Sequence, residues 1–146
     1  MTARKNRKTI EKFVDCLNNH NMEDFYELFH DDYIEEYPQS GERIRGKDNL
    51  RKVYENFKDL PEVKAYSLEC SGNLGVLEML LDYPQGGTYN ACEIIKFKNG
   101  KITHLKAYFA QPFEAADWRS EWVEMMGETQ EETSRELYDE TPRPRA

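Results

Sequence analysis

Residues 92–110 read CEIIKFKNGKITHLKAYFA, and the architecture predicted for the rest of the chain follows from this segment. β-Branched and aromatic residues fill two arms, and Asn99-Gly100 lies between them. That composition around an Asn-Gly pair predicts a β-hairpin. Because side chains alternate along a strand, Glu93, Ile95 and Phe97 share one face of the first arm.

The hairpin register follows from matching the faces of the two arms. One face of the second arm carries Thr103, Leu105, Ala107 and Phe109. A two-residue loop would place Ile95 opposite His104, which mixes an apolar face with a polar one. A three-residue loop over residues 98–100 places Ile95 opposite Thr103 and Glu93 opposite Leu105. Since register follows burial, we predict the three-residue loop, with Gly100 in the left-handed conformation as a bulge. Glu93 is then a carboxylate on an apolar strand face.

Composition limits the class of protein. A chain of 146 residues with 38% hydrophobic and 33% charged residues is typical of one soluble globular domain. The net charge of −8 argues against nucleic acid as a partner. From Glu114 onward there are ten acidic residues and four arginines, so −6 of that charge lies there. No run of residues is apolar and long enough for a secretory signal or a membrane span. Three cysteines, an odd number without metal-like spacing, indicate reduced and mostly buried thiols in a cytoplasmic protein.

Hydrophobic periodicity changes once along the chain. Apolar spacing of three and four predicts helices over residues 9–19 and 47–57, with a short one near 25–29. Strands are predicted over residues 33–37, Glu42–Arg45, 66–70 and 76–83, before the hairpin. Helices followed by a run of strands indicate an α+β fold, in which a curved antiparallel sheet wraps the first helices and leaves a cleft.

The C-terminal part divides into two predicted segments. A short helix through Trp118 and Trp122 is expected to pack over the barrel. Beyond it, residues 127–146 are polar, acidic and punctuated by proline, which is typical of disorder. We therefore expect one domain over residues 1–126 and a disordered acidic tail over residues 127–146.

Several local strings, in this order and spacing, resemble those of one superfamily. They are Phe29-His30-Asp31-Asp32, Pro38-Gln39-Ser40-Gly41-Glu42 with Ile44 and Gly46, Phe97-Lys98-Asn99-Gly100-Lys101-Ile102, Ala107-Tyr108-Phe109, Pro112-Phe113-Glu114 and Trp118-Arg119. Over residues 10–123 the chain resembles the nuclear transport factor 2-like superfamily and, within it, the SnoaL-like proteins.

The resemblance implies a cone-shaped α+β barrel with a deep apolar pocket and dimerisation through the outer sheet face. The superfamily includes isomerases, cyclases, dehydratases and epoxide hydrolases, but also non-catalytic binding domains, so the fold leaves the function open. Against its ketosteroid isomerase branch, the base carboxylate falls at Tyr37, the catalytic tyrosine at Phe13 and the second carboxylate at Glu93. One of three positions keeps its chemistry, which argues against isomerisation by that mechanism.

Glu93 and Tyr37 are the candidate catalytic residues. An apolar surrounding would raise the pKa of Glu93 and suit its carboxyl for acid/base chemistry, whereas an ion pair or a wet pocket mouth would make it structural. Tyr33, Glu35 and Tyr37 share one strand face; for Glu35 a solvated edge strand is the favoured interpretation. The expected ligand-binding residues are Phe13, Tyr33, Glu35, Tyr54, Leu77, Met79, Leu81, Ile95, Leu105, Ala107 and Phe109.

Two functions of different class share these features. The first is cofactor-free acid/base catalysis (isomerisation, cyclisation or dehydration) on a small hydrophobic molecule, and the second is a non-catalytic binding module. The three histidines show no ligand spacing, so no metal is expected. No Gly-rich loop leads into a predicted helix as phosphate binding requires, and no cofactor is expected. A homodimer is expected through an outward row of Ile94, Ile102 and Tyr108.

Overall fold

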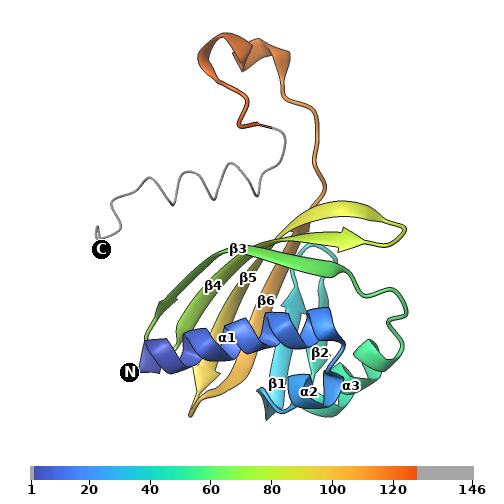
Figure 1. The fold of residues 1–146 in the computed structure, drawn as a ribbon, viewed down its shortest axis with the longest axis vertical. Helices are drawn as coiled ribbons and strands as arrows, with labels where there is room; N and C mark the ends of the chain where they lie inside the picture. Colours follow the sequence, from blue (N-terminus) through green and yellow to red (C-terminus); the bar gives the residue numbers. More distant parts are fainter. Residues whose placement is uncertain (1, 128–146) are drawn as a thin grey trace.

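A computed structural model describes residues 2–127, in which a six-stranded sheet curves around the first helix (Figure 1). The sheet order is β2-β1-β6-β5-β4-β3, and every neighbouring pair is antiparallel except β1 and β6. The elements are α1 (Thr2–Asn19), α2 (Met22–Tyr26), β1 (Phe29–Tyr37), β2 (Glu42–Arg45), α3 (Lys47–Glu55), β3 (Glu62–Ser71), β4 (Leu74–Tyr83), β5 (Gly87–Lys98), β6 (Lys101–Ala110) and the 3₁₀ helix η1 (Asp117–Trp122). The predicted α+β class, with a mainly antiparallel curved sheet, is confirmed.

The hairpin between β5 and β6 differs from the predicted loop. Lys98 pairs with Lys101, so the turn has two residues, and both Asn99 (φ 51°) and Gly100 (φ 80°) are left-handed. Thr103 is an extra residue in β6, and this bulge shifts the register so that Ile95 faces Leu105. The predicted three-residue loop was wrong. The extra residue lies inside β6 and not in the turn, and there it aligns the apolar faces of β5 and β6.

The same bulge changes the side to which Ile102 points. Ile102 pairs with Phe97 and is fully buried, whereas the sequence placed it on the outer face. Its N–H donates to the carbonyl of Leu28 at 2.9 Å, which ties the hairpin to the end of α2. The outward row expected at the dimer interface therefore loses this residue.

Helix α1 lies across the concave side of the sheet and packs on β3 and β4 (Figure 1). Its apolar stripe, with Ile10, Phe13 and Leu17, is buried as the spacing predicted. The helix begins at Thr2, earlier than expected, and Asn6 in its added first turns is buried, with its amide donating to the Gly72 carbonyl at 2.9 Å. This bond holds the basic first turns of α1 against the β3–β4 turn.

The core lies between the helices and one end of the sheet. Ile10 closely approaches Gly75, since a Cβ there would lie 2.5 Å from the Ile10 Cδ1. Phe25 and Phe29 add an aromatic layer, with ring centroids 4.9 Å apart. At this end the inner sheet face is closed.

Beyond β6, residues 111–127 stand away from the sheet (Figure 1). Trp118 and Trp122 are 76% and 74% exposed, so the expectation that they pack over the barrel is wrong. The rest of the predicted tail, residues 128–146, lies outside the described residues. None of the helices within residues 2–127 is long and apolar enough to cross a membrane.

Candidate functional site

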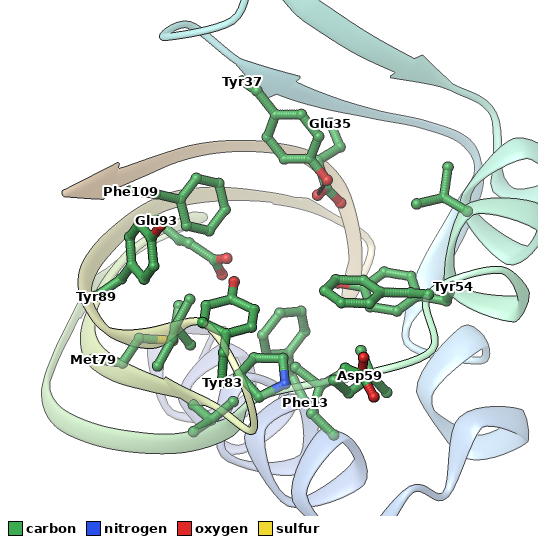
Figure 2. A pocket seen from close by; sticks show the side chains of 18 of the residues that line it. Phe13, Glu35, Tyr37, Tyr54, Asp59, Met79, Tyr83, Tyr89, Glu93 and Phe109 are labelled. Carbon is green, nitrogen blue, oxygen red and sulfur yellow. Dashed lines mark hydrogen bonds between the residues drawn. The ribbon is translucent and has the colours of Figure 1, made fainter. Parts of the chain in front are cut away.

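The open end of the sheet holds a pocket of about 660 Å³ (Figure 2). Helix α1 forms one wall, α3 and the loop after it a second, and β1 with β3–β6 the remainder. Its lining residues are Phe13, Leu17, Glu35, Tyr37, Val53, Tyr54, Phe57, Asp59, Leu60, Pro61, Val63, Met79, Leu81, Tyr83, Gln85, Gly86, Tyr89, Glu93 and Phe109. An apolar cavity with few polar groups is the usual form of a small-molecule site.

Glu35 lies in the pocket wall and is 5% exposed, contrary to the solvated edge position favoured from the sequence. Strand β1 is an interior strand, because β6 pairs on one side of it and β2 on the other. The Tyr33 hydroxyl donates to Glu35 Oε1 at 2.7 Å, and the Tyr37 hydroxyl donates to Oε2. Burial raises the pKa of Glu35, and these two hydrogen bonds oppose the rise.

Glu93 is the second buried carboxyl in the pocket, at 8% exposure. It comes from β5, and its Oε1 has no hydrogen-bond partner within residues 2–127. Figure 2 shows its carboxyl pointing into the cavity, on the side of Tyr89 and Phe109. Burial, and then the negative charge of Glu35, raises the pKa of Glu93 to about 8. The Glu93 carboxyl is therefore neutral at pH 7 and can donate a hydrogen bond.

Aromatic residues form most of the remaining wall. Tyr54 and Phe57 stack with centroids 6.3 Å apart, and Phe57 stacks on Tyr83 at 6.5 Å. Burial, the largest cause, raises the pKa of Tyr37, Tyr54 and Tyr83. These side chains stay neutral, so the pocket offers flat apolar surfaces with hydroxyl donors at their edges.

Eight of the site residues named from the sequence line this pocket. They are Phe13, Glu35, Tyr37, Tyr54, Met79, Leu81, Glu93 and Phe109. The other five lie in the core and do not line the cavity: Tyr33, Leu77, Ile95, Leu105 and Ala107. All five point inward as predicted and are almost fully buried in the core. Tyr33, for example, packs on the ring of Phe29 at 4.6 Å and reaches the site only through its bond to Glu35.

The lining residues that sequence reasoning missed lie mainly in two connections. One runs from Phe57 to Val63, between α3 and β3, and the other is the β4–β5 turn with Gln85 and Gly86. Connections have no periodicity from which a face can be assigned. Their position in the sequence was the one available signal, because both connections flank strands whose inner faces were already predicted to be apolar.

The site contains two buried carboxyls, and the exposed Asp59 at its edge, but no arrangement suited to a metal ion. Across residues 2–127, no group of three or more His, Cys, Asp or Glu side chains could hold one. The buried carboxyls in the pocket are instead Glu35 and Glu93, with tyrosine hydroxyls around them. Two carboxyls whose environments differ are typical of an acid and base pair.

Comparison with known proteins gives a family and a fold. A family model described as a SnoaL-like domain matches residues 10–105. An NTF-2 like protein of unknown function from Burkholderia xenovorans LB400 is 33% identical, with a TM-score of 0.79 over 87% of this chain and 99% of that chain. A putative ketosteroid isomerase from Kribbella flavida is 19% identical, with a TM-score of 0.78 over 86% and 93%.

An LEH-like epoxide hydrolase from M. tuberculosis is 20% identical, with a TM-score of 0.66 over 73% of this chain and 84% of that chain. At these lower identities the likeness concerns the fold alone. Among curated proteins, none matches the chain.

Proposed function

The chain belongs to the SnoaL-like family, and we propose that its pocket binds a small, largely apolar carbonyl compound and moves a proton on it without a cofactor. The observation that carries this proposal is that the pocket holds two buried carboxyls whose hydrogen-bond surroundings differ. Glu35 accepts two tyrosine hydroxyls, whereas Glu93 Oε1 has no partner among the described residues. Such a difference separates the pKa values of two carboxyls and so assigns an acid and a base.

Glu93 takes the role of the acid. With a pKa of about 8 it keeps its proton at neutral pH, and the unpartnered oxygen leaves the carboxyl available to a ligand. A carbonyl oxygen in the cavity would accept its hydrogen bond. This would stabilise the negative charge that develops on that oxygen when a neighbouring carbon loses a proton.

Glu35 takes the role of the base, with Tyr37 as the group that positions it. The two hydroxyl donors favour its carboxylate form over the acid form. In the proposed step, Glu35 accepts a proton from the carbon beside the carbonyl, the C–H electron pair becomes a C=C bond, and the C=O π pair moves to the oxygen. The product is an enolate whose oxygen accepts the hydrogen bond of Glu93. Return of that proton to another carbon of a conjugated ligand completes an isomerisation.

The second candidate is the non-catalytic binding module, and one observation favours it. Glu35 already accepts hydrogen bonds on both oxygens, and donors on a carboxylate weaken it as a base. In that case the tyrosines and Glu93 would orient a ligand without reacting with it. The pocket would then serve recognition alone.

Hydrogen exchange separates the two candidates. We would incubate the protein in D₂O with a panel of uncharged cyclic ketones and enones and follow the protons beside the carbonyl by NMR. Catalysis predicts accelerated exchange that Glu35→Gln and Glu93→Gln each reduce by about 10² or more. The matched control is Glu36→Gln, the next residue on β1, which lies on the opposite face and should keep the wild-type rate.

Each outcome decides between the candidates. Binding of the panel compounds without exchange, with affinity retained in Glu93→Gln, would support the binding module and overturn the enzyme. Exchange that survives both Gln substitutions would overturn the assignment of the carboxyls. A panel that neither binds nor exchanges would overturn an apolar carbonyl compound as the ligand class.

A further inference from the structure

Residues 111–127, the C-terminal arm, carry large apolar side chains that the domain does not cover. Phe113 is 86% exposed, Trp118 76%, Trp122 74% and Met125 77%. Every residue of the arm is exposed except the half-buried Ala116. Isolated apolar residues on a surface are ordinary, but several on one extended segment usually mark an interface.

The arm leaves the domain from a fixed point. The Gln39 side chain bonds both the N–H and the carbonyl of Phe109, each at 2.6 Å, as a neighbouring strand would. Gln111 donates to the Tyr89 hydroxyl at 2.9 Å. From this root, the arm in Figure 1 rises away from the sheet, and the apolar residues lie beyond it. The arm is therefore directed outward and does not fold over its own pocket.

The charge of the arm indicates the surface that it fits. Its four acidic residues and one arginine give a net charge of −3. The outer sheet face over β2, β1, β6 and β5 carries the opposite charge. Its cations are Arg43, Arg45, Lys96, Lys98 and Lys106, and they outnumber its two acidic residues, Asp32 and Glu36. Glu36 already pairs with Arg43 at 2.8 Å, so the other cations carry the charge argument.

Apolar residues lie between those cations on the outer face. Ile34, Ile94 and Tyr108 point away from the buried side, and Tyr108 is 39% exposed. The surface thus combines apolar contact area with positive charge, and the arm combines aromatic side chains with negative charge. Opposite charges of this kind favour encounter and fix orientation.

We propose that the C-terminal arm of one copy of this chain packs on the outer sheet face of a second copy, and that two such arms are exchanged. The arm is long enough, since 17 extended residues span about 55 Å. The six strands of the sheet are only about 24 Å across at their usual spacing. Three aromatic side chains bury about 500 Å² per arm, so two exchanged arms bury about 1,000 Å², the lower limit for a specific interface.

The two tryptophans of the chain are Trp118 and Trp122, so tryptophan fluorescence reports on the arm alone. We would record emission wavelength and acrylamide quenching of the full-length protein from about 50 μM down to about 50 nM, with sedimentation velocity on the same samples. The proposal predicts a dimer whose tryptophan emission is blue-shifted and whose tryptophans are protected from acrylamide. The emission should shift to the red at concentrations at which the dimer dissociates.

Charge-reversal variants identify the surface. Lys96→Glu with Lys106→Glu should weaken self-association by about tenfold or more, and the loss should shrink at high salt. The matched control is Lys5→Glu with Lys8→Glu, the same change of charge on the exposed side of α1. Adding Glu121→Lys and Glu124→Lys to the first variant should restore association, because the charges are then exchanged.

Four results would overturn the proposal. Exposed tryptophans in a dimer would show that the arm lies outside the interface. Protected tryptophans in a monomer would show that the arm folds on its own domain. A monomer with exposed tryptophans at all concentrations would leave a different protein as the partner. If the dimer does not dissociate at any of these concentrations, the charge-reversal variants provide the test. Failure of the added Glu121→Lys and Glu124→Lys to restore association would exclude the outer sheet face as the surface that the arm binds.

Discussion

The two ends of the concave sheet face carry similar apolar side chains but differ in what lies over them. At one end, the first half of α1 packs directly on the strands, and Ile10 fills the space above Gly75. At the other end, Phe13 forms only one side of a cavity of about 660 Å³, and Phe57 forms another. The comparison shows that an inward-facing strand position becomes core or binding site according to the helix and loops opposite it.

The largest expected effect tests this comparison on one strand. Leu77 and Leu81 both point inward from β4, but only Leu81 lines the pocket. We expect Leu77→Ala to lower the free energy of unfolding by about 2–5 kcal/mol, since it leaves a cavity in a closed core. Leu81→Ala should cost at least about 1 kcal/mol less, because its side chain already borders empty space. Urea denaturation of both variants measures the difference, and equal losses would contradict the distinction.

The second prediction concerns Glu93 in the open end. Its folded pKa of about 8 lies above the ordinary glutamate value of 4.5, so between these pH values the folded state holds a proton that the unfolded state has lost. Stability should therefore fall as pH rises through that window, by up to about 5 kcal/mol if the whole shift is realised. In Glu93→Gln the fall should be much smaller, since only the raised pKa of Glu35 then contributes to it, and the variant should be as stable as wild type or more so near neutral pH.

Two measurements check the Glu93 prediction. Denaturation curves at several pH values follow the fall in stability, with Glu69→Gln, an exposed substitution on β3, as the control. NMR titration of the Glu93 carboxyl tests the cause directly. A pKa at or below about 4.3 would mean that the carboxylate is solvated or ion-paired, and Glu93 could then not serve as the proposed acid.

A third, smaller effect tests how tightly the closed end is packed. A Cβ at Gly75 would lie 2.5 Å from Ile10 Cδ1, so Gly75→Ala should cost about 1–3 kcal/mol by overpacking. Ile10→Val removes that methyl group, and the double variant should lose less than the sum of the single losses. A double-mutant cycle measured by denaturation gives the coupling, and strict additivity would show that the two groups do not compete for space.

The smallest effect is expected from removing residues 127–146. The acidic residues after Met126 lack the apolar content to form a core. A chain that ends at Met126 should keep its melting temperature within a few degrees of the full-length value. A loss on the order of 10 °C in a thermal scan would show instead that these residues pack on the domain.

The sequence by itself determined the elements and their faces. The stripe of Ile10, Phe13 and Leu17 predicted the side of α1 that is buried, and alternation along β5 placed Glu93 on the inner sheet face. These inferences succeed because helix and strand periods are local properties of the backbone. Asn99-Gly100 likewise marked the hairpin, since few other pairs adopt two left-handed conformations at low cost.

The tertiary structure alone decided which faces close and which stay open. The bulge at Thr103 follows from pairing with β5, and it reversed the side predicted for Ile102. Glu35 is buried because β6 and β2 flank β1, a neighbourhood set by residues far along the chain. The pocket depends on where α1 and the loop after α3 stop covering the sheet. Burial of this kind is a sum over distant contacts, and no local pattern encodes it.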